Sequence, residues 1–370
     1  MRVLLPPASH SYIQGESQPL LAPPVRPRTP LWQGLFGSAV SAIVSLLVVS
    51  LIVALLPRLL SWAVVRAVWT GDGGACMGGG ACWAFLRAKL PFILFGIYPP
   101  AEQWRPVSVI VLFLALTLWT LPPSHWTRAT LGLWIAGTLC ALLLMGGGFA
   151  GLASVPTSGW GGLPITVLLT VLSLGLGFPF GVLLALGRRA KLMVVRVLSV
   201  GLIELIRGLP LVTLLFIASI VLPIMLPAGV TIDKLLRALI ALTVFAAAYL
   251  AEVVRGGLQD IPKGQEEAAQ ALGLTWLQTM RLIVLPQAIR KVIPPLTNTV
   301  VVTVKNTSLV LVVGLFDLLS SGRAALADPA WPSPYAETYC FIALIYFAIC
   351  FSISRYSLWL ECCLAHGAAR

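Results

Sequence analysis

The sequence predicts an all-α polytopic membrane protein with about eight transmembrane helices. Of its 370 residues, 58% are hydrophobic and only 10% are charged, whereas soluble domains carry about a quarter charged residues. A helix needs about 20 apolar residues to cross a bilayer, and uncharged stretches at least that long recur along the chain. These stretches are residues 31–57, 106–127, 129–187 and 208–232. A soluble globular protein is therefore excluded.

The charge balance is strongly basic, with 25 Lys and Arg against 13 Asp and Glu and a net charge of +12. The cations are spread along a lipid-soluble chain and form no soluble basic domain, so we expect no nucleic-acid binding. Basic loops instead hold helix ends on the cytoplasmic side of a membrane.

The N-terminal part of the sequence predicts a tail, residues 1–30, followed by an extension, residues 31–162. Residues 1–30 are rich in Pro and Ser and predict a disordered cytoplasmic tail. Residues 31–162 predict an extension with three transmembrane helices, at 31–57, 107–121 and 129–145. We expect Pro57 and Arg58 to close the first helix and Pro122-Pro123 to end the second, because proline clashes with the preceding turn and lacks a donor. Residues 59–105 predict an outer interfacial loop.

The C-terminal part, residues 163–360, predicts five further transmembrane helices. Their ranges are 163–186, 209–226, 235–255, 293–316 and 336–358. The basic cluster 188–191 beside a helix end marks the cytoplasmic side. Eight crossings place both termini in the cytoplasm and leave 361–370 as a second cytoplasmic tail. Five basic residues do not fit this topology, because it places them outside: Arg58, Arg66, Arg87, Lys89 and Arg105.

Cys76 and Cys82 flank a glycine-rich segment that this topology places on the oxidising side of the membrane. A disulfide and a pair of unlinked thiols both remain open for them. His10, His125 and His366 are scattered and no cysteine has a histidine in ligand spacing, so no metal site is expected.

A hydrophilic hairpin follows the sixth predicted helix. Residues 265–272 are good helix formers, with Glu266 and Glu267 in the first turn, where they favour the positive end of the helix dipole. Gly273 suits a left-handed cap. Thr275 followed by Gln278 is a capping-box signature for a second helix, which we expect to end at Pro286.

Several motifs around this hairpin carry a resemblance. The run Glu267-Ala268-Ala269, then Gly273, then Ile283-Val284-Leu285-Pro286 resembles the EAA loop of ABC-importer permeases, which docks on the ATP-binding subunit. The flanking segments 251–258, 264–265, 286–288 and 305–309, with 207–211 upstream, look like permeases for polar amino acids. The resemblance covers residues 163–358 and implies a type I ABC-importer permease core.

The N-terminal half carries a second resemblance. Segments 81–83, 95–99 and 103–106 are similar to the larger permease subunit of general L-amino-acid importers. In that subfamily three extra helices precede the five-helix core, in agreement with the eight helices counted here.

The resemblance implies a transport subunit of the bacterial inner membrane and three kinds of partner. They are two copies of a cytoplasmic ATPase, a second homologous permease and a periplasmic amino-acid-binding protein. The chain has no Gly-x-x-x-x-Gly-Lys-Ser/Thr stretch to cradle a nucleotide, so ATP and Mg are expected on the partner ATPase. The ATPase-docking residues implied by the resemblance are Gln265, Glu266, Glu267, Ala268, Ala269, Leu272 and Gly273.

Charged residues within predicted helices are costly unless they are paired. Glu252 with Arg255 and Glu204 with Arg207 have i,i+3 spacing, and an internal salt bridge is favoured over substrate contact for both pairs. Lys305 has no carboxylate in its own helix. It either lines the substrate pathway with Asn306, Thr307 and Ser308 or bridges to the partner permease.

The sequence argues against two other classes of protein. An ion-coupled secondary carrier should show paired inverted repeats with broken helices, whereas this chain offers one hairpin on one side. A membrane enzyme such as a lipid transferase needs a cluster of His, Asp or Glu at the interface, and no such cluster is visible in the sequence.

Overall fold

A computed structural model describes residues 31–227 and 229–367. The described residues fall into two compact units, one that ends at Val65 and one that begins at Arg66. The predicted cytoplasmic tail 1–30 and the last three residues lie outside the described ranges.

The first unit contains α1 (Leu31–Phe36), α2 (Ala39–Leu60) and one π turn, η1 (Ser61–Val65). Ser38 caps α2 through a reciprocal capping box with Ser41. The helix was predicted to close at Pro57, but it continues through Pro57 to Leu60. A proline removes one backbone hydrogen bond, and membrane helices tolerate it where local π adjustment satisfies the neighbouring groups. The span 39–65 is strongly apolar, with a mean hydropathy of 2.9 over its 18-residue window and one charged residue, Arg58, near its end.

The second unit holds the other predicted crossings. They are α4 (Trp104–Thr120), α5 (Arg128–Gly146), α6 (Gly162–Gly187), α10 (Lys234–Gln259), α14 (Ile293–Asn306) with the 3-10 turn η8 (Thr307–Val313), and α16 (Tyr335–Gly367). In the described ranges, seven helices including α2 are long and apolar enough to cross a membrane, or eight if one bent pair forms a single span. The prediction of about eight helices is confirmed on that count. The last helix was predicted to end near Leu358 and instead continues to Gly367.

The bent pair contains a helix that was not predicted, α7 (Met193–Gly208). It meets α8 (Leu211–Phe216), which continues through the π turn η6 (Ile217–Val221) into α9 (Leu222–Met225), at an angle of 104°. The bend falls at Leu209, whose extended backbone (φ −96°, ψ 136°) is the conformation that the following Pro210 favours. The short span 211–225 therefore starts from a helix that lies across its direction.

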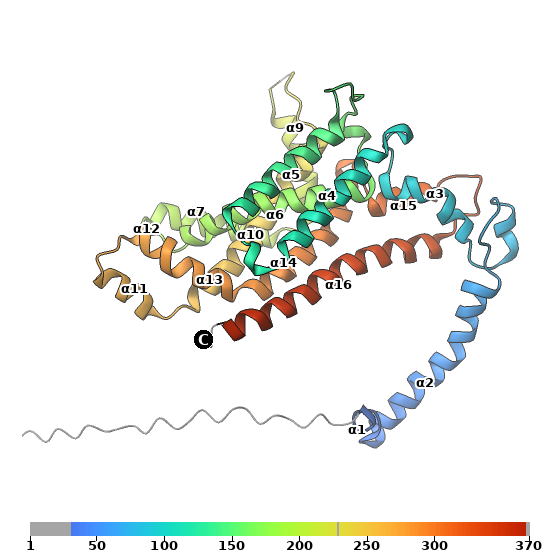
Figure 1. Ribbon diagram of the computed structural model, residues 1–370, viewed down its shortest axis with the longest axis horizontal. Helices are drawn as coiled ribbons and strands as arrows, with labels where there is room; N and C mark the ends of the chain where they lie inside the picture. Colours follow the sequence, from blue (N-terminus) through green and yellow to red (C-terminus); the bar gives the residue numbers. More distant parts are fainter. Residues whose placement is uncertain (1–30, 228, 368–370) are drawn as a thin grey trace, which may run out of the picture. The chain divides into compact units, whose positions relative to one another are not determined.

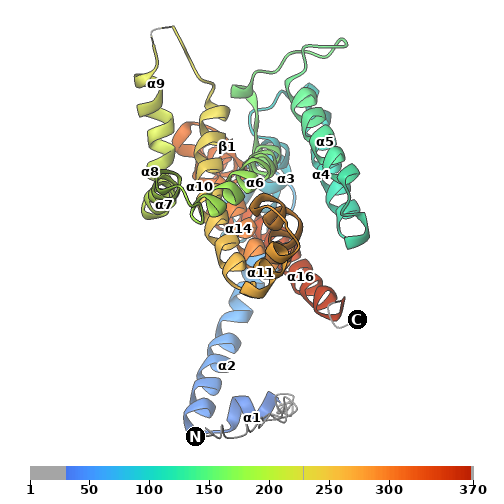
Figure 2. The same ribbon diagram turned by 90° about the vertical axis from the view of Figure 1, so that its left-hand side faces the viewer.

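Helices α6 and α10 form the centre of the second unit and lie side by side in both views (Figure 1, Figure 2). Gly177 and Gly181 of α6 allow this close packing. A Cβ at Gly177 would lie 3.1 Å from the Cβ of Ala246, and one at Gly181 would lie 2.9 Å from the Cβ of Leu250. Small residues at helix contacts are typical of membrane proteins, where close packing replaces the hydrophobic driving force.

At one end of the second unit, α3 (Trp83–Phe95) packs against α15 (Leu318–Ala325), with Phe85 and Ile93 fully buried. Segment 59–105 was predicted to be an outer interfacial loop, but part of it forms the packed helix α3. Single turns connect the elements: η2 (Ala75–Gly78), η3 (Pro100–Glu102), η4 (Pro123–His125) and η5 (Thr157–Gly159), with the two-residue strand β1 (Phe316–Asp317) before α15.

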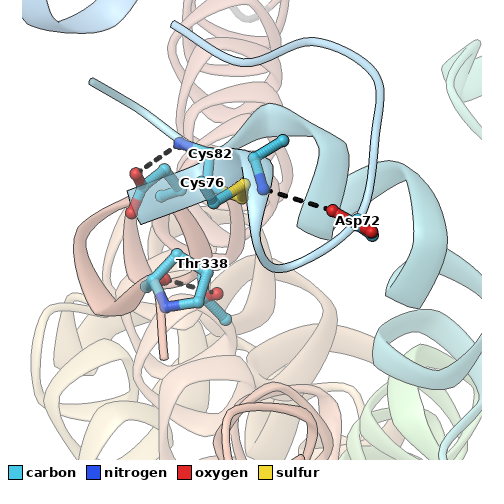
Figure 3. Close-up of a disulfide and its surroundings, with 7 residues drawn as sticks. Asp72, Cys76, Cys82 and Thr338 are labelled. Atoms are coloured by element: carbon cyan, nitrogen blue, oxygen red, sulfur yellow. Dashed lines mark hydrogen bonds between the residues drawn. A yellow bond between two sulfur atoms is a disulfide. The ribbon is translucent and has the colours of Figure 1, made fainter. Parts of the chain in front are cut away.

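A disulfide joins Cys76 to Cys82 in front of α3, which resolves the alternative left open by the sequence (Figure 3). The amide of Cys82 donates a hydrogen bond to Oε1 of Glu337 at 2.7 Å. The segment just before the closed loop fits tightly on the segment before α16, since a Cβ at Gly73 would lie 1.8 Å from the carbonyl oxygen of Ala330. Phe85 packs edge-on against Trp331 at 5.5 Å. The segment around the disulfide and the segment before α16 thus form one packed layer.

Candidate functional site

The hydrophilic hairpin projects from the second unit at the end opposite α3 and α15 (Figure 1). It contains α11 (Lys263–Ala271), α12 (Trp276–Thr279), the π turn η7 (Met280–Val284) and α13 (Leu285–Lys291). Gly273 has φ +76°, and Thr275 and Gln278 form both hydrogen bonds of a capping box. The predicted first helix, left-handed cap and capping box are confirmed.

The predicted end of the second helix at Pro286 is wrong. Pro286 is instead the second residue of α13, directly after the π turn. The amide of Leu285 bonds to the carbonyl of Met280, and a proline in the first turn of a helix loses no bond because that turn has free amides. The helical path therefore continues from Trp276 to Lys291.

The predicted docking residues occupy an exposed surface with one buried member. Gln265, Glu267, Ala268, Leu272 and Gly273 are exposed, Glu266 is half-buried, and Ala269 is 1% exposed. Leu272 is 79% exposed, and Trp276, Leu277 and Leu282 of the following helical segment are also exposed. Exposed apolar and charged side chains thus lie together on the hairpin.

Three polar contacts hold the hairpin to the rest of the second unit or hold its two arms together. Nη2 of Arg189 lies 2.6 Å from Oε1 of Glu266, so the turn after α6 is tied to α11. Gln287 donates to Gln265 at 3.1 Å. Nζ of Lys291 binds the carboxylate of Asp260 at 2.8 Å. These contacts give the hairpin a defined orientation.

A cluster of charges lies where α6, α7 and α10 meet, and Glu252 is its centre. Glu252 binds Arg255 of the same helix, as predicted. It also accepts a hydrogen bond from Nη1 of Arg188 at 2.9 Å and lies 3.7 Å from Nη1 of Arg207. One carboxylate thus contacts guanidinium groups from three helix segments.

The predicted salt bridge between Glu204 and Arg207 is not formed among the described residues. Glu204 instead lies 3.3 Å from Nη2 of Arg188, while Arg207 turns to Glu252 and stacks over Tyr249 at 5.8 Å. Spacing on one helix predicted the wrong partners because α6 and α10 offer closer ones. Arg188, which ends α6, was not among the candidate residues. Its position directly after an uncharged helix was the available signal.

The predicted pathway residues separate into exposed and buried side chains. Lys305 is exposed at the end of α14, and Asn306 and Ser308 are half-buried. Thr307 is fully buried and donates a hydrogen bond to the carbonyl of Val304 at 2.7 Å. The α-helix changes to a 3-10 turn here, so these four residues do not share one helical face.

Known proteins resemble this chain over most of its length. The inner membrane amino-acid ABC transporter permease protein YhdY of Escherichia coli (strain K12) is 43% identical over 92% of this chain and 96% of that protein. The family model of binding-protein-dependent transport system inner membrane components matches residues 177–361. The chain belongs to this family. The resemblance to amino-acid ABC permeases stated from the sequence is confirmed.

Two further proteins are similar to this permease. The glutamate/glutamine/aspartate/asparagine transport system permease protein BztC of Rhodobacter capsulatus is 38% identical over 76% of this chain and 78% of that protein. The solved crystal structure of an amino acid ABC transporter with histidines is 32% identical, with a TM-score of 0.48, over 54% of this chain and 90% of that chain. Family membership assigns the permease a transport role and implies an ATPase and a binding protein as partners.

Proposed function

We propose that the permease carries polar amino acids into the bacterial cytoplasm as part of an ATP-driven importer. A periplasmic binding protein delivers the amino acid, and an ATPase dimer supplies the energy. The names of YhdY and BztC, for amino acids and for glutamate, glutamine, aspartate and asparagine, support this class of cargo. Nothing in the relatives named above favours the ion-coupled carrier.

The exposed hairpin is the observation that supports ATPase docking best. Its two neighbouring glutamates have different surroundings, because Glu266 faces Arg189 within the chain while Glu267 is exposed. Glu267 and Leu272 therefore offer a charge and an apolar knob to the ATPase. Gln265, Ala268, Ala269 and Gly273 shape the surface between them. ATP and Mg are bound by the ATPase.

A second homologous permease completes the passage in this proposal. Lys305 lies 12 residues into α14, about 18 Å along a helix that rises about 1.5 Å per residue. It has no carboxylate partner among the described residues, and a cation at depth needs one. The carboxylate of a substrate or a residue of the second permease meets that need. Asn306, Thr307 and Ser308 accompany Lys305, and Glu252 with Arg255 lies nearer the cytoplasmic exit.

The proposed topology places both termini in the cytoplasm. The basic residues 188–191 mark the inner side, and the disulfide between Cys76 and Cys82 suits the oxidising outer side. Eight crossings, counting the bent pair as one, connect these positions consistently.

The proposed mechanism is alternating access. Closure of the ATPases on ATP pulls the hairpin, and the ion pair between Glu266 and Arg189 passes this movement to the turn between α6 and α7. The bent pair and α10 then turn so that the pathway opens outward, and ATP hydrolysis resets it.

Reconstitution tests this function directly. The permease, its ATPase, the second permease and the binding protein are placed in vesicles, and uptake of labelled glutamate, glutamine, aspartate and asparagine is measured. We expect uphill uptake that requires ATP and the ATPase. Uphill uptake by the permease alone would overturn the proposal in favour of the carrier.

A further inference from the structure

An apolar groove of about 590 Å³ lies between α6, α7 and α10. Large side chains from all three helices form its walls, among them Phe180, Leu183, Leu202 and Ile240. Each of these four is between 39% and 63% exposed, so the chain itself leaves the groove open. The groove borders the turn at 188–192, because Gly187 and Val195 on either side of that turn both line it.

The lining favours a flexible acyl chain over a packed helix. Helix contacts in membranes use small residues that let backbones approach closely. The small residues of α6, Gly177 and Gly181, are already used against α10. The groove also includes the small residues Gly187, Ser199, Thr243, Ala247 and Ala248, but most of its lining consists of larger Leu, Phe, Ile and Val side chains, which adapt to a mobile hydrocarbon chain.

The lining itself carries no charge, but the turn beside the groove is basic. Lys191 is exposed in the turn and forms no ion pair with the described residues. Arg196, on the first turn of α7, donates two hydrogen bonds to the carbonyl of Ala190, at 3.1 and 2.8 Å, and closes the turn without a carboxylate. The residues around Arg196 are apolar and exposed: Leu192, Met193, Val194, Val195, Val197 and Leu198. Basic pockets between helices on the cytoplasmic side suit anionic headgroups.

We propose that this groove binds an anionic phospholipid of the inner leaflet. One acyl chain lies between α6, α7 and α10, and the phosphate headgroup contacts Lys191 and Arg196. The bound lipid fills the space beside α7, the helix that ends at the bend at Leu209. It therefore moves with the turn that Arg189 ties to the hairpin.

Photocrosslinking in the assembled transporter tests the proposal. Leu202 is replaced by a photoreactive phenylalanine derivative, and the complex is placed in vesicles of phosphatidylethanolamine with a minor share of phosphatidylglycerol. Leu198, which is 67% exposed on the same helix and does not line the groove, is the matched control position. Adducts are identified by intact-mass and lipid analysis.

We expect phosphatidylglycerol adducts at Leu202 enriched at least about fivefold over the bulk share, the effect of one basic residue near an anionic lipid. At Leu198 the adducts should follow the bulk composition. Lys191→Gln should lower the enrichment about fivefold, whereas Lys234→Gln, on an exposed lysine at the other end of α10, should not change it. Bulk composition at both positions, or an adduct to a polypeptide at Leu202, would overturn the proposal.

Discussion

Arg189 and Glu266 are 77 residues apart and join by an ion pair of 2.6 Å. The pair connects the turn after α6 with the first turn of α11. Both side chains are about one-third exposed, at 35% and 28%, and ion pairs near a surface contribute at most about 1 kcal/mol to folding stability. The pair therefore matters for orientation of the hairpin more than for stability.

We predict that Arg189→Ala and Glu266→Ala each lower uptake by about fivefold, which corresponds to a coupling free energy of about 1 kcal/mol. Complex assembly should persist. The charge-swapped double variant Arg189→Glu with Glu266→Arg should recover part of the uptake, because it restores the pair. Uptake and ATPase binding are measured for all three. Purely additive losses in the double variant would show that the residues do not act together.

The glutamate next in the sequence gives a control with a different expected defect. Glu267 is exposed and forms no ion pair among the described residues. Glu267→Ala should weaken ATPase binding, whereas Glu266→Ala should leave that binding unchanged. Identical effects of the two substitutions would contradict the separate roles.

Gly273 tests the turn of the hairpin. A Cβ there would meet nothing within 4 Å, so the cost of substitution arises from φ +76° and not from a clash. Gly273→Val should lose ATPase stimulation, because an L-residue in this region costs about 1–2 kcal/mol. Gly273→Asn should stay near the wild type, since asparagine adopts this conformation more readily. Full stimulation by the valine variant would remove Gly273 from the docking assignment.

The two glutamates of the charge cluster should differ in their effect on stability. Glu252→Gln leaves three guanidinium groups without their shared carboxylate, and we expect a loss of about 1–3 kcal/mol in the free energy of unfolding. Glu204 is 55% exposed and has one partner, so Glu204→Gln should cost less than about 1 kcal/mol. Thermal unfolding in detergent compares the two. Equal losses in the free energy of unfolding would show that Glu252 is not the centre of the charge cluster.

The disulfide leads to two predictions, one on the accessibility of its thiols to a labelling reagent and one on the folding stability of the chain. Cys76 and Cys82 should react with a membrane-impermeant maleimide only after reduction and only from the outer side. The double substitution Cys76→Ser with Cys82→Ser should lower the free energy of unfolding by about 2 kcal/mol, the value for closing so short a loop. Cys140→Ser, at an exposed free thiol, is the control. Labelling without reductant would contradict the bond.

Lys305 tests the substrate pathway. We predict that Lys305→Met lowers uptake while assembly with the ATPase persists, and that Lys305→Arg keeps more activity because it keeps the charge. Uptake kinetics at varied amino-acid concentration are the measurement. Unchanged kinetics in the methionine variant would exclude Lys305 from the pathway.

The features that could be predicted from the sequence depend on neighbours in the chain. The long apolar runs placed α4, α5, α6 and α10 within a few residues, because bilayer thickness sets their length. Gly273 and the pair Thr275 and Gln278 predicted the hairpin, since a cap is formed by residues three or four apart.

The features that were missed depend on packing between distant segments. Helix α7 carries Arg196, Glu204 and Arg207, which interrupt the apolar pattern that a spanning helix shows. The pairing of Arg188 with Glu252 joins positions 64 residues apart, and no spacing rule predicts it. Whether Cys76 and Cys82 are bonded was also open, because composition alone does not determine the distance between two thiols.

The layer that joins the disulfide loop to the segment before α16 has a consequence for shortened versions of the chain. The family match covers residues 177–361, which invites expression of the core alone. Such a truncation would remove the Phe85 ring that packs on Trp331 and the Lys89 side chain that pairs with Asp328. It would also remove the amide that donates a hydrogen bond to Glu337. A buried carboxylate and an uncovered indole would then face solvent or lipid. The minimal expressible piece therefore begins upstream of Cys76, well before the family signature starts.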